Sequence, residues 1–332
     1  MDNKKASTPV ILGVLAAVTL IAAFLAIRFG SSSLSLQEVW SGLLRQNPDS
    51  AATKILWVVR LPHTAACLLA GIGLAVSGVL LQAATNNSLA GPNIIGVNAG
   101  AGFAMVLGMC FFPMAYRLFP LIAFVGAFLC TALILLVAGK VGGSRVSIVL
   151  SGVAVSTLLS AGISLLRLLF PDMAVIYSYF SVGGVSGVTF DKLLIPGIFI
   201  GVATLLAFLL SGRLNLLCLG DDLAKTLGIR VKLLRTVALL LASACAASAV
   251  SFAGLLGFVG LMVPHIARYL LRGNDLRKLL PVSALLGGTL VILADLLGRL
   301  LFAPSQIPAG IFTALLGAPF FFALLLQRRN RL

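Results

Sequence analysis

Charged residues are scarce in this sequence. Of its 332 residues, 10% are charged and only nine are acidic, whereas soluble domains carry about 25% charge. Hydrophobic residues make up 60% of the chain, and the mean hydropathy is +1.12. A composition this poor in charge excludes a large soluble core and predicts an all-α, polytopic membrane protein.

Histidine and cysteine are also rare, with two and five residues respectively. The cysteines show no paired spacing, and most lie in apolar runs, where cysteine behaves as a small hydrophobe. His63 and His265 are far apart in the sequence and have no cysteine or carboxylate at ligand spacing. We therefore predict neither disulfides nor a metal site.

The usual signatures of catalysis are missing as well. The sequence has no HExxH or GxSxG motif and no GxxxxGK(S/T) phosphate loop, because the segment around Lys140 lacks the upstream glycine spacing and the hydroxyl. The chain is therefore predicted not to be an enzyme and not to hydrolyse nucleotide alone. A membrane-embedded enzyme would need a reacting constellation that these motifs do not provide.

Carboxylates within apolar runs are almost absent, although secondary carriers usually bury them to bind protons or sodium. Only Asp295 lies clearly inside such a run, four residues before Arg299 on the same helix face. We expect these two residues to pair near the outer interface rather than to form a proton relay. A secondary carrier that works without ATP remains the alternative from another functional class.

Apolar runs close to the ~20 residues that cross a bilayer fill almost the whole chain. The first run follows Met1–Ser7 and is interpreted as a retained span rather than a signal peptide. Glycines such as Gly71, Gly78 and Gly260 predict close helix packing, and Pro264 predicts a bent or broken eighth run. The ten predicted spans are residues 9–29, 61–84, 93–112, 117–138, 146–170, 192–210, 233–251, 252–271, 279–302 and 307–326.

The formal net charge of +15 is explained by a membrane protein with basic loops. With the N-terminus inside, two thirds of the 24 lysines and arginines fall on the inner side, as the positive-inside rule requires. We therefore expect both termini in the cytoplasm and no nucleic acid partner.

A polar island at residues 214–232 separates two of the apolar runs. It contains a predicted short helix, with Gly220 as N-cap and two acids in the first turn, where the helix dipole favours negative charge. Gly228 suits a left-handed stop, and Leu223, Leu227 and Ala224 are expected to share one apolar face. Because about two turns are too few for a helix to be stable alone, we expect it to contact another chain.

Several motifs occur together in a fixed order, and they cover nearly the whole chain. The chain resembles the permease subunit of the iron–siderophore, haem and vitamin B12 family of bacterial type II ABC importers. The motifs are RLP at 60–62, GIGLAVSGVLLQ at 71–82, NSLAGPNIIGVN at 87–98, LGDDLAKTLG at 219–228, GFVGLMVPHIAR at 257–268 and PAGIFTALLGAP at 308–319.

The resemblance implies a single transmembrane permease domain over residues 1–332, with ten spans, in the bacterial cytoplasmic membrane. Such a permease works as a homo- or heterodimer with two cytoplasmic ATPase subunits and an extracytoplasmic substrate-binding protein. No cofactor is expected in this chain, because ATP and magnesium would bind the ATPase. The expected cargo is an iron–siderophore, with haem or cobalamin as alternatives.

The resemblance also assigns roles to particular residues. Arg60 and Arg299 are expected to dock the binding protein, with His63 standing where the family usually has a second arginine. Asn87, Ser88 and Leu89 are expected to form a cytoplasmic gate, with Ser88 replacing the usual proline, and residues 144–147 a second constriction. The expected coupling helix to the ATPase, at about 219–228, consists of Leu219, Gly220, Asp221, Asp222, Leu223, Ala224, Leu227 and Gly228.

Overall fold

The computed structural model describes residues 8–30, 34–303 and 305–329, and these residues form helices and connecting turns. Each of the ten predicted spans corresponds to one principal helix, although α9 (Phe190–Cys218) continues beyond its predicted end at residue 210, so the predicted all-α membrane architecture is confirmed. These helices are α1 (Thr8–Arg28), α4 (Leu61–Thr85), α5 (Val97–Phe111), α6 (Phe119–Lys140), α7 (Arg145–Leu169), α9 (Phe190–Cys218), α11 (Val231–Ala253), α12 (Val259–Leu271), α13 (Leu276–Leu301) and α14 (Ala309–Arg329).

Seven helical segments in the described part of the chain are long and apolar enough to cross a membrane, whereas α5, α12 and α14 contribute shorter apolar stretches.

Shorter helices connect the long ones. The connecting helices are α2 (Leu36–Leu43), α3 (Ala51–Lys54), the π-helix η1 (Ile55–Arg60), the 3₁₀ helices η2 (Pro92–Ile95) and η3 (Tyr116–Leu118), α8 (Met173–Val182) and α10 (Asp221–Thr226).

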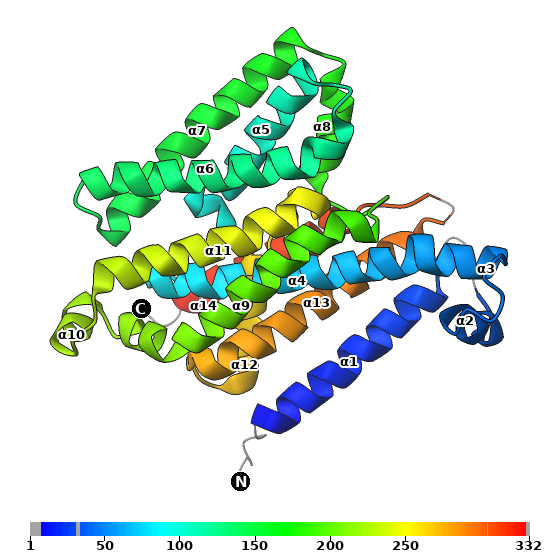
Figure 1. The fold of residues 1–332 in the computed structure, drawn as a ribbon. Coiled ribbons are helices and arrows are strands. Elements are labelled where there is room, and N and C mark those ends of the chain that lie inside the picture. Colours follow the sequence, from blue (N-terminus) through cyan, green and yellow to red (C-terminus); the bar gives the residue numbers. More distant parts are fainter. Residues whose placement is uncertain (1–7, 31–33, 304, 330–332) are drawn as a thin grey trace.

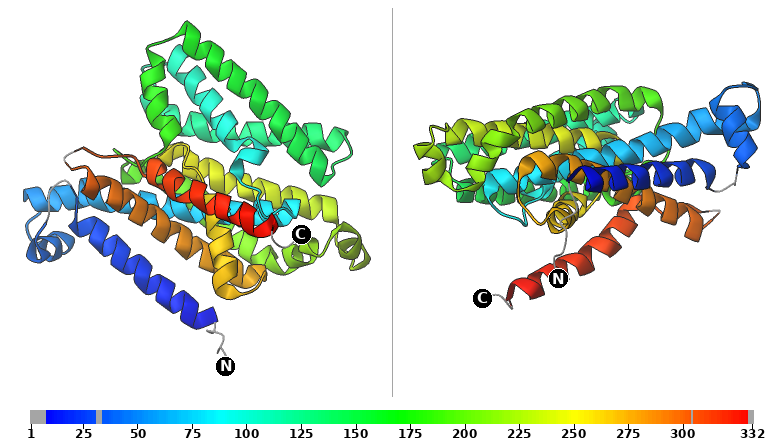
Figure 2. Two further views of the ribbon diagram at one scale, coloured as in Figure 1. Left: turned by 180° about the vertical axis from the view of Figure 1, so that it is seen from behind. Right: turned by 90° about the horizontal axis from the view of Figure 1, so that it is seen from below.

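Helix α4 is the centre of the bundle. It packs against α9, α11, α12 and α13, while α1 lies along α13 and α5 to α8 form a group beyond α11 (Figures 1 and 2). Most α4 side chains are buried, because a helix that is apolar on all sides is enclosed by other helices. Figure 1 shows α10 at one end of the bundle and α2 and α3 at the other.

Glycines bring α4 into direct backbone contact with its neighbours, as predicted. A Cβ built on Gly71 would lie 2.1 Å from the carbonyl oxygen of Gly287 on α13, and one on Gly78 would lie 1.8 Å from that of Gly260 on α12. Neither gap admits a side chain. Small residues of this kind let helices approach closely where the bilayer gives no hydrophobic driving force for association.

The break in the eighth run lies at residues 254–258, between α11 and α12, and not at Pro264 as predicted. Pro264 lies inside the continuous helix α12, whereas Gly254 and Phe258 have left-handed backbone conformations. The exposed peptide groups find protein partners: Leu255 N donates to Phe180 O (3.0 Å), and Gly184 N donates to Ala253 O (2.8 Å). Irregular backbone at membrane depth requires such partners, because lipid offers none.

We expect Gly71→Ala to destabilise the fold, because the added methyl group would meet the Gly287 backbone and force α4 and α13 apart. Overpacking of this kind typically costs about 1–3 kcal/mol. The matched control is Gly201→Ala on α9, where a Cβ would meet no atom within 4 Å. Thermal unfolding in detergent should show a lower midpoint for Gly71→Ala only, and equal midpoints would contradict the proposed backbone contact.

Candidate functional site

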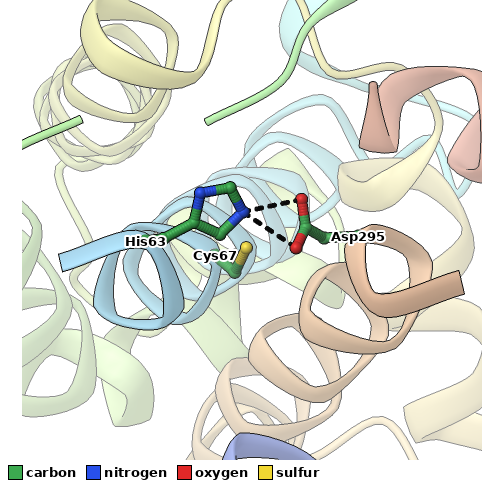
Figure 3. Close-up of side chains that lie close together, drawn as sticks. All are labelled: His63, Cys67 and Asp295. Atoms are coloured by element: carbon green, nitrogen blue, oxygen red, sulfur yellow. Dashed lines mark hydrogen bonds and ion pairs between the residues drawn. The ribbon is translucent and has the colours of Figure 1, made fainter. Parts of the chain in front are cut away.

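Two polar clusters lie at opposite ends of the bundle, and the first joins α4 to α13. His63 Nε2 lies 2.9 Å from both carboxylate oxygens of Asp295, and Arg299 Nε donates to Asp295 Oδ2 at 2.8 Å. The predicted pairing of Asp295 with Arg299 is thus confirmed. Cys67, one turn after His63, completes the group in Figure 3, so that helical spacing and the α4–α13 contact together create this cluster.

Arg60 and Arg299 also hold the end of α1. Arg60 Nη1 donates to the carbonyl oxygens of Ile27 and Arg28, both at 2.6 Å, and Arg299 Nη1 donates to that of Ala26 at 3.3 Å. The last carbonyls of a helix lack intrahelical partners and form its negative end, so cations are stabilising there.

The three residues expected to dock a binding protein are therefore turned inward. Arg60, His63 and Arg299 are only 4%, 7% and 7% exposed, because they are bound to α1 and Asp295. In the described structure, these three side chains present no charged surface to another protein. A docking contact would require their release from these partners. The sequence alone does not predict this burial, because arginines in an RLP motif and near a helix end are typical of a protein surface.

The cluster also holds a possible set of metal ligands that the spacing argument missed. Donor atoms of His63, Cys67 and Asp295 all lie within 4.8 Å of one another. The expectation that His63 has no cysteine or carboxylate at ligand spacing was wrong, because Cys67 is four residues away and the fold supplies Asp295. Both carboxylate oxygens already lie against His63 Nε2, and Oδ2 also accepts from Arg299 Nε, so the present contacts favour a hydrogen-bonded network.

The second cluster surrounds α10, at the other end of the bundle. Gly220 and Gly228 bound the helix with positive φ angles of 115° and 79°, as the sequence predicts. Leu219, Leu223 and Leu227 form an outward apolar row, 57%, 58% and 56% exposed, whereas Ala224 is buried against the bundle. The expectation that Ala224 shares a face with Leu223 and Leu227 was wrong.

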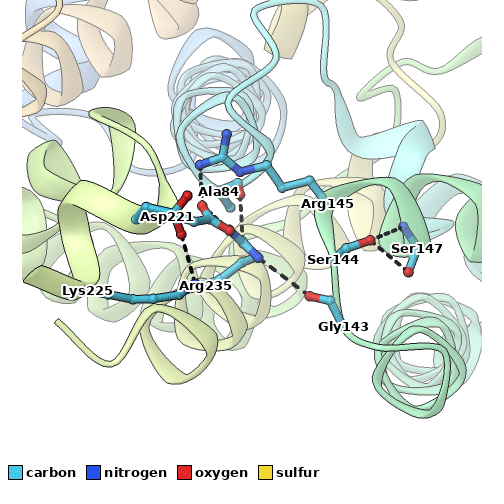
Figure 4. A network of polar contacts seen from close by, with 9 residues as sticks. Ala84, Gly143, Ser144, Arg145, Ser147, Asp221, Lys225 and Arg235 are labelled. Atoms are coloured by element: carbon cyan, nitrogen blue, oxygen red, sulfur yellow. Dashed lines mark hydrogen bonds and ion pairs between the residues drawn. The ribbon is translucent and has the colours of Figure 1, made fainter.

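The two acids of α10 have different partners. Asp222 forms an exposed pair with Lys225 at 3.1 Å. Asp221 instead accepts from Arg145 Nη2 at 2.5 Å and from Arg235 Nη2 at 2.6 Å (Figure 4). Partial burial alone would raise the pKa of Asp221, but the hydrogen bonds and charges of Arg235 and Arg145 outweigh it and lower the pKa below its usual value.

The expected gate residues form a hydrogen-bonded turn after α4. Asn86 has the left-handed conformation (φ 49°) that asparagine tolerates better than most residues. Asn87 Oδ1 accepts from Leu89 N at 3.0 Å, and Asn87 O accepts from Ala90 N at 3.1 Å. The turn borders a cavity of about 190 Å³, whose lining includes Leu89, Asn98, Phe258 and Leu261.

The expected second constriction is a capped helix start. Ser144 Oγ accepts from Ser147 N at 3.0 Å, and Ser147 Oγ donates to Val141 O at 3.0 Å. These bonds fix the turn between α6 and α7 immediately beside Arg145, which binds Asp221.

Comparison with known proteins decides the family, because the profile of the FecCD transport family matches residues 18–327. This chain belongs to the FecCD transport family. It is 38% identical to the iron(3+)-hydroxamate import system permease protein FhuB of Bacillus subtilis, over 94% of this chain and 82% of that protein. It is 32% identical to the hemin transport system permease protein HmuU of Yersinia pestis, over 99% of each chain.

A solved structure agrees with this assignment. A chain of an inward-facing metal-chelate type ABC transporter superposes with a TM-score of 0.86 at 32% identity, covering 96% of this chain and 99% of that one. The FecCD fold described above is therefore a type II ABC importer permease fold, as the motifs predict. The roles of individual residues remain predictions, because family membership does not test them.

Removing the carboxylate from the cluster of His63, Asp295 and Arg299 should strongly destabilise this FecCD permease. Asp295→Ala would leave Arg299 buried without its ionic partner, and breaking a buried ion pair typically costs about 3–5 kcal/mol. Asp49→Ala is the control, because Asp49 pairs with Lys54 on the surface, where ion pairs contribute little. Chemical or thermal unfolding in detergent measures both, and similar midpoints for the two variants would rule out the cluster as a stabilising element.

Asp221→Asn should lower the unfolding temperature by a pH-dependent amount. Because the folded pKa of Asp221 is depressed, its ionic contribution is fully present above the unfolded pKa of about 3.9 and is lost as pH falls through the lower folded pKa. The difference in unfolding temperature between Asp221→Asn and the parent should thus be constant between about pH 6 and 8 and shrink below about pH 4. Asp222→Asn, the neighbouring substitution, should show no pH-dependent difference in unfolding temperature from the parent. An equal effect of the two substitutions would contradict a stabilising role for the ion pairs of Asp221.

Proposed function

We propose that this chain forms the transmembrane pathway of an ABC importer that carries an iron–siderophore chelate across the bacterial cytoplasmic membrane. The relatives named above belong to an iron(III)-hydroxamate import system and a hemin transport system, and another, from Bacillus subtilis, belongs to an iron(III)-citrate import system. The named cargoes are all chelated iron, so a bulky metal chelate is the cargo class that these relatives support. Haem or cobalamin remains the alternative cargo.

The observation that carries the proposal is the surface of α10. Leu223 lies on this short helix and Leu219 and Leu227 flank it, and all three leucines are exposed. Asp221 fastens the helix to the bundle, but the apolar row is left uncovered. A contiguous apolar row rimmed by charged residues is typical of a protein interface. We infer that a cytoplasmic ATPase subunit covers it and supplies the work that this chain, without a phosphate loop, does not.

The other parts of the proposed complex follow from the same arrangement. The end with α10 faces the cytoplasm together with both termini, whose last residues lie outside the described ranges. A second permease, identical or paralogous, packs against the exposed face of α14, which leaves the bundle in Figure 2 and exposes Leu315 and Phe322. The binding protein docks at the opposite end, where Arg60 and Arg299 would be released from α1 and His63 from Asp295.

Transport would proceed by alternating access. ATP-driven closure of the ATPase moves α10, and this shift favours one of two states of the cytoplasmic gate at residues 87–89. Such coupling requires that α10 makes different contacts in the two states.

The direct test uses proteoliposomes that contain this chain, its co-purifying ATPase and the cognate binding protein. Uptake of radioiron as siderophore, citrate or haem complexes should require ATP and survive collapse of the proton gradient. ATP-independent uptake that collapses with the gradient would instead support the secondary carrier.

Shortening the apolar row should weaken ATPase binding. Truncating a central interface side chain can cost about 2 kcal/mol or more, so we expect Leu223→Ala to reduce affinity for the ATPase by at least about tenfold. Leu209→Ala on α9 is the control, because Leu209 is at least as exposed as Leu223 (68% against 58%) but lies in a membrane-spanning helix. Pull-down with the purified ATPase measures both; equal binding would exclude α10 as the interface.

A further inference from the structure

Arg235 of α11 lies where three separate segments of the cytoplasmic end meet. It is buried, 4% exposed, and each nitrogen of its guanidinium group reaches a different part of the chain. Nη2 binds Asp221 of α10 at 2.6 Å, Nε donates to Ala84 O in the last turn of α4 at 3.1 Å, and Nη1 reaches Gly143 O at 3.5 Å (Figure 4).

We propose that Arg235 is a positioning residue that links movement of α10 to the two turns at the cytoplasmic end of the pathway. This proposal rests on the proposed function, since it assumes that α10 is displaced by an ATPase. It goes further by naming the side chain through which the displacement reaches the pathway.

The positions of the two carbonyl acceptors support this role. Ala84 lies next to the end of α4, directly before the turn that contains Asn87, Ser88 and Leu89. Gly143 directly precedes Ser144, which caps α7. A single rigid group thus contacts the backbone beside both predicted constrictions.

Arg145 strengthens the connection from the other side. Its Nη2 donates to the same carboxylate of Asp221, so α10 is bound to the start of α7 and to α11 at once. Asp221 can leave its place only by breaking charge-assisted hydrogen bonds to both helices, and these are the strongest kind in proteins. A displacement of α10 therefore pulls on both helices rather than on a flexible loop.

The chemistry of arginine is required for this geometry. Its planar group presents five N–H donors in a fixed fork, whereas lysine offers one flexible ammonium. Lysine at position 235 could keep the charge pair with Asp221 but could not at the same time hold Ala84 O and Gly143 O. Arg235→Lys therefore separates the linking role from the charge.

A residue that only stabilises the fold would make the same contacts. The test therefore needs a measurement that a change in stability alone would not alter. We suggest Ser88→Cys as a reporter in the assembled transporter. Its reaction rate with a membrane-impermeant maleimide is measured with and without a non-hydrolysable ATP analogue, and labelling of a parent without the new cysteine is subtracted. If α10 moves the turn, the analogue should change the rate at least about fivefold, the lower range of coupling between linked sites.

In the reporter background, Arg235→Lys and Asp221→Asn should still assemble with the ATPase but lose the effect of the nucleotide analogue on labelling. Uptake per ATP hydrolysed should fall about tenfold or more in both, within the usual range of coupling. Arg213→Gln is the control, because Arg213 is an exposed arginine on the neighbouring α9, and it should keep both values. If Arg235→Lys does not insert, Asp221→Asn alone decides, because Asp221 is partly exposed.

Three results would overturn the proposal: a parent transporter whose Ser88→Cys labelling ignores the analogue, variants that keep the labelling change, or variants that keep the parent's uptake per ATP. The proposed function fails on a separate measurement, namely the absence of ATP-driven chelate uptake by the parent complex. The two failures can therefore be told apart.

Discussion

Direct backbone contact between α4 and its neighbours is the constraint on which the rest of this structure depends. Gly71 meets Gly287, and Gly78 meets Gly260, at distances that leave no room for a side chain. These contacts fix the positions of α12 and α13 against the central helix. The polar groups at the two ends of the bundle can meet only because the apolar middle is held this closely.

Both polar clusters use a single carboxylate to bind basic side chains from different elements. Asp295 binds His63 and Arg299 within the bundle, while Asp221 binds Arg145 and Arg235 at its edge. The first cluster is almost fully enclosed and fastens α1, whereas the second includes a carboxylate that is one third exposed. The same kind of carboxylate cluster thus holds α1 in an enclosed site at one end of the bundle and α10 in a partly exposed site at the other.

The sequence was sufficient for the helices but not for the contacts between them. Apolar runs of membrane length predicted ten spans because the bilayer sets the length of each, and the glycines around 220–228 predicted the bounds of α10. The partners of Asp221 were missed because Arg145 lies 76 residues away and Arg235 lies 14 away, with no periodicity to connect them. The inward orientation of Arg60 was missed because it depends on where the end of α1 lies.

The helix break at 254–258 has a consequence for how the chain is made. The carbonyl of its neighbour Gly183 accepts from Gly310 N at 3.0 Å, and Gly310 lies at the start of α14, which is synthesised after the break. Until that helix enters the membrane, the Gly183 carbonyl lacks this partner, in surroundings where lipid provides no substitute. The junction beside the break is therefore completed only when α14 has joined the bundle.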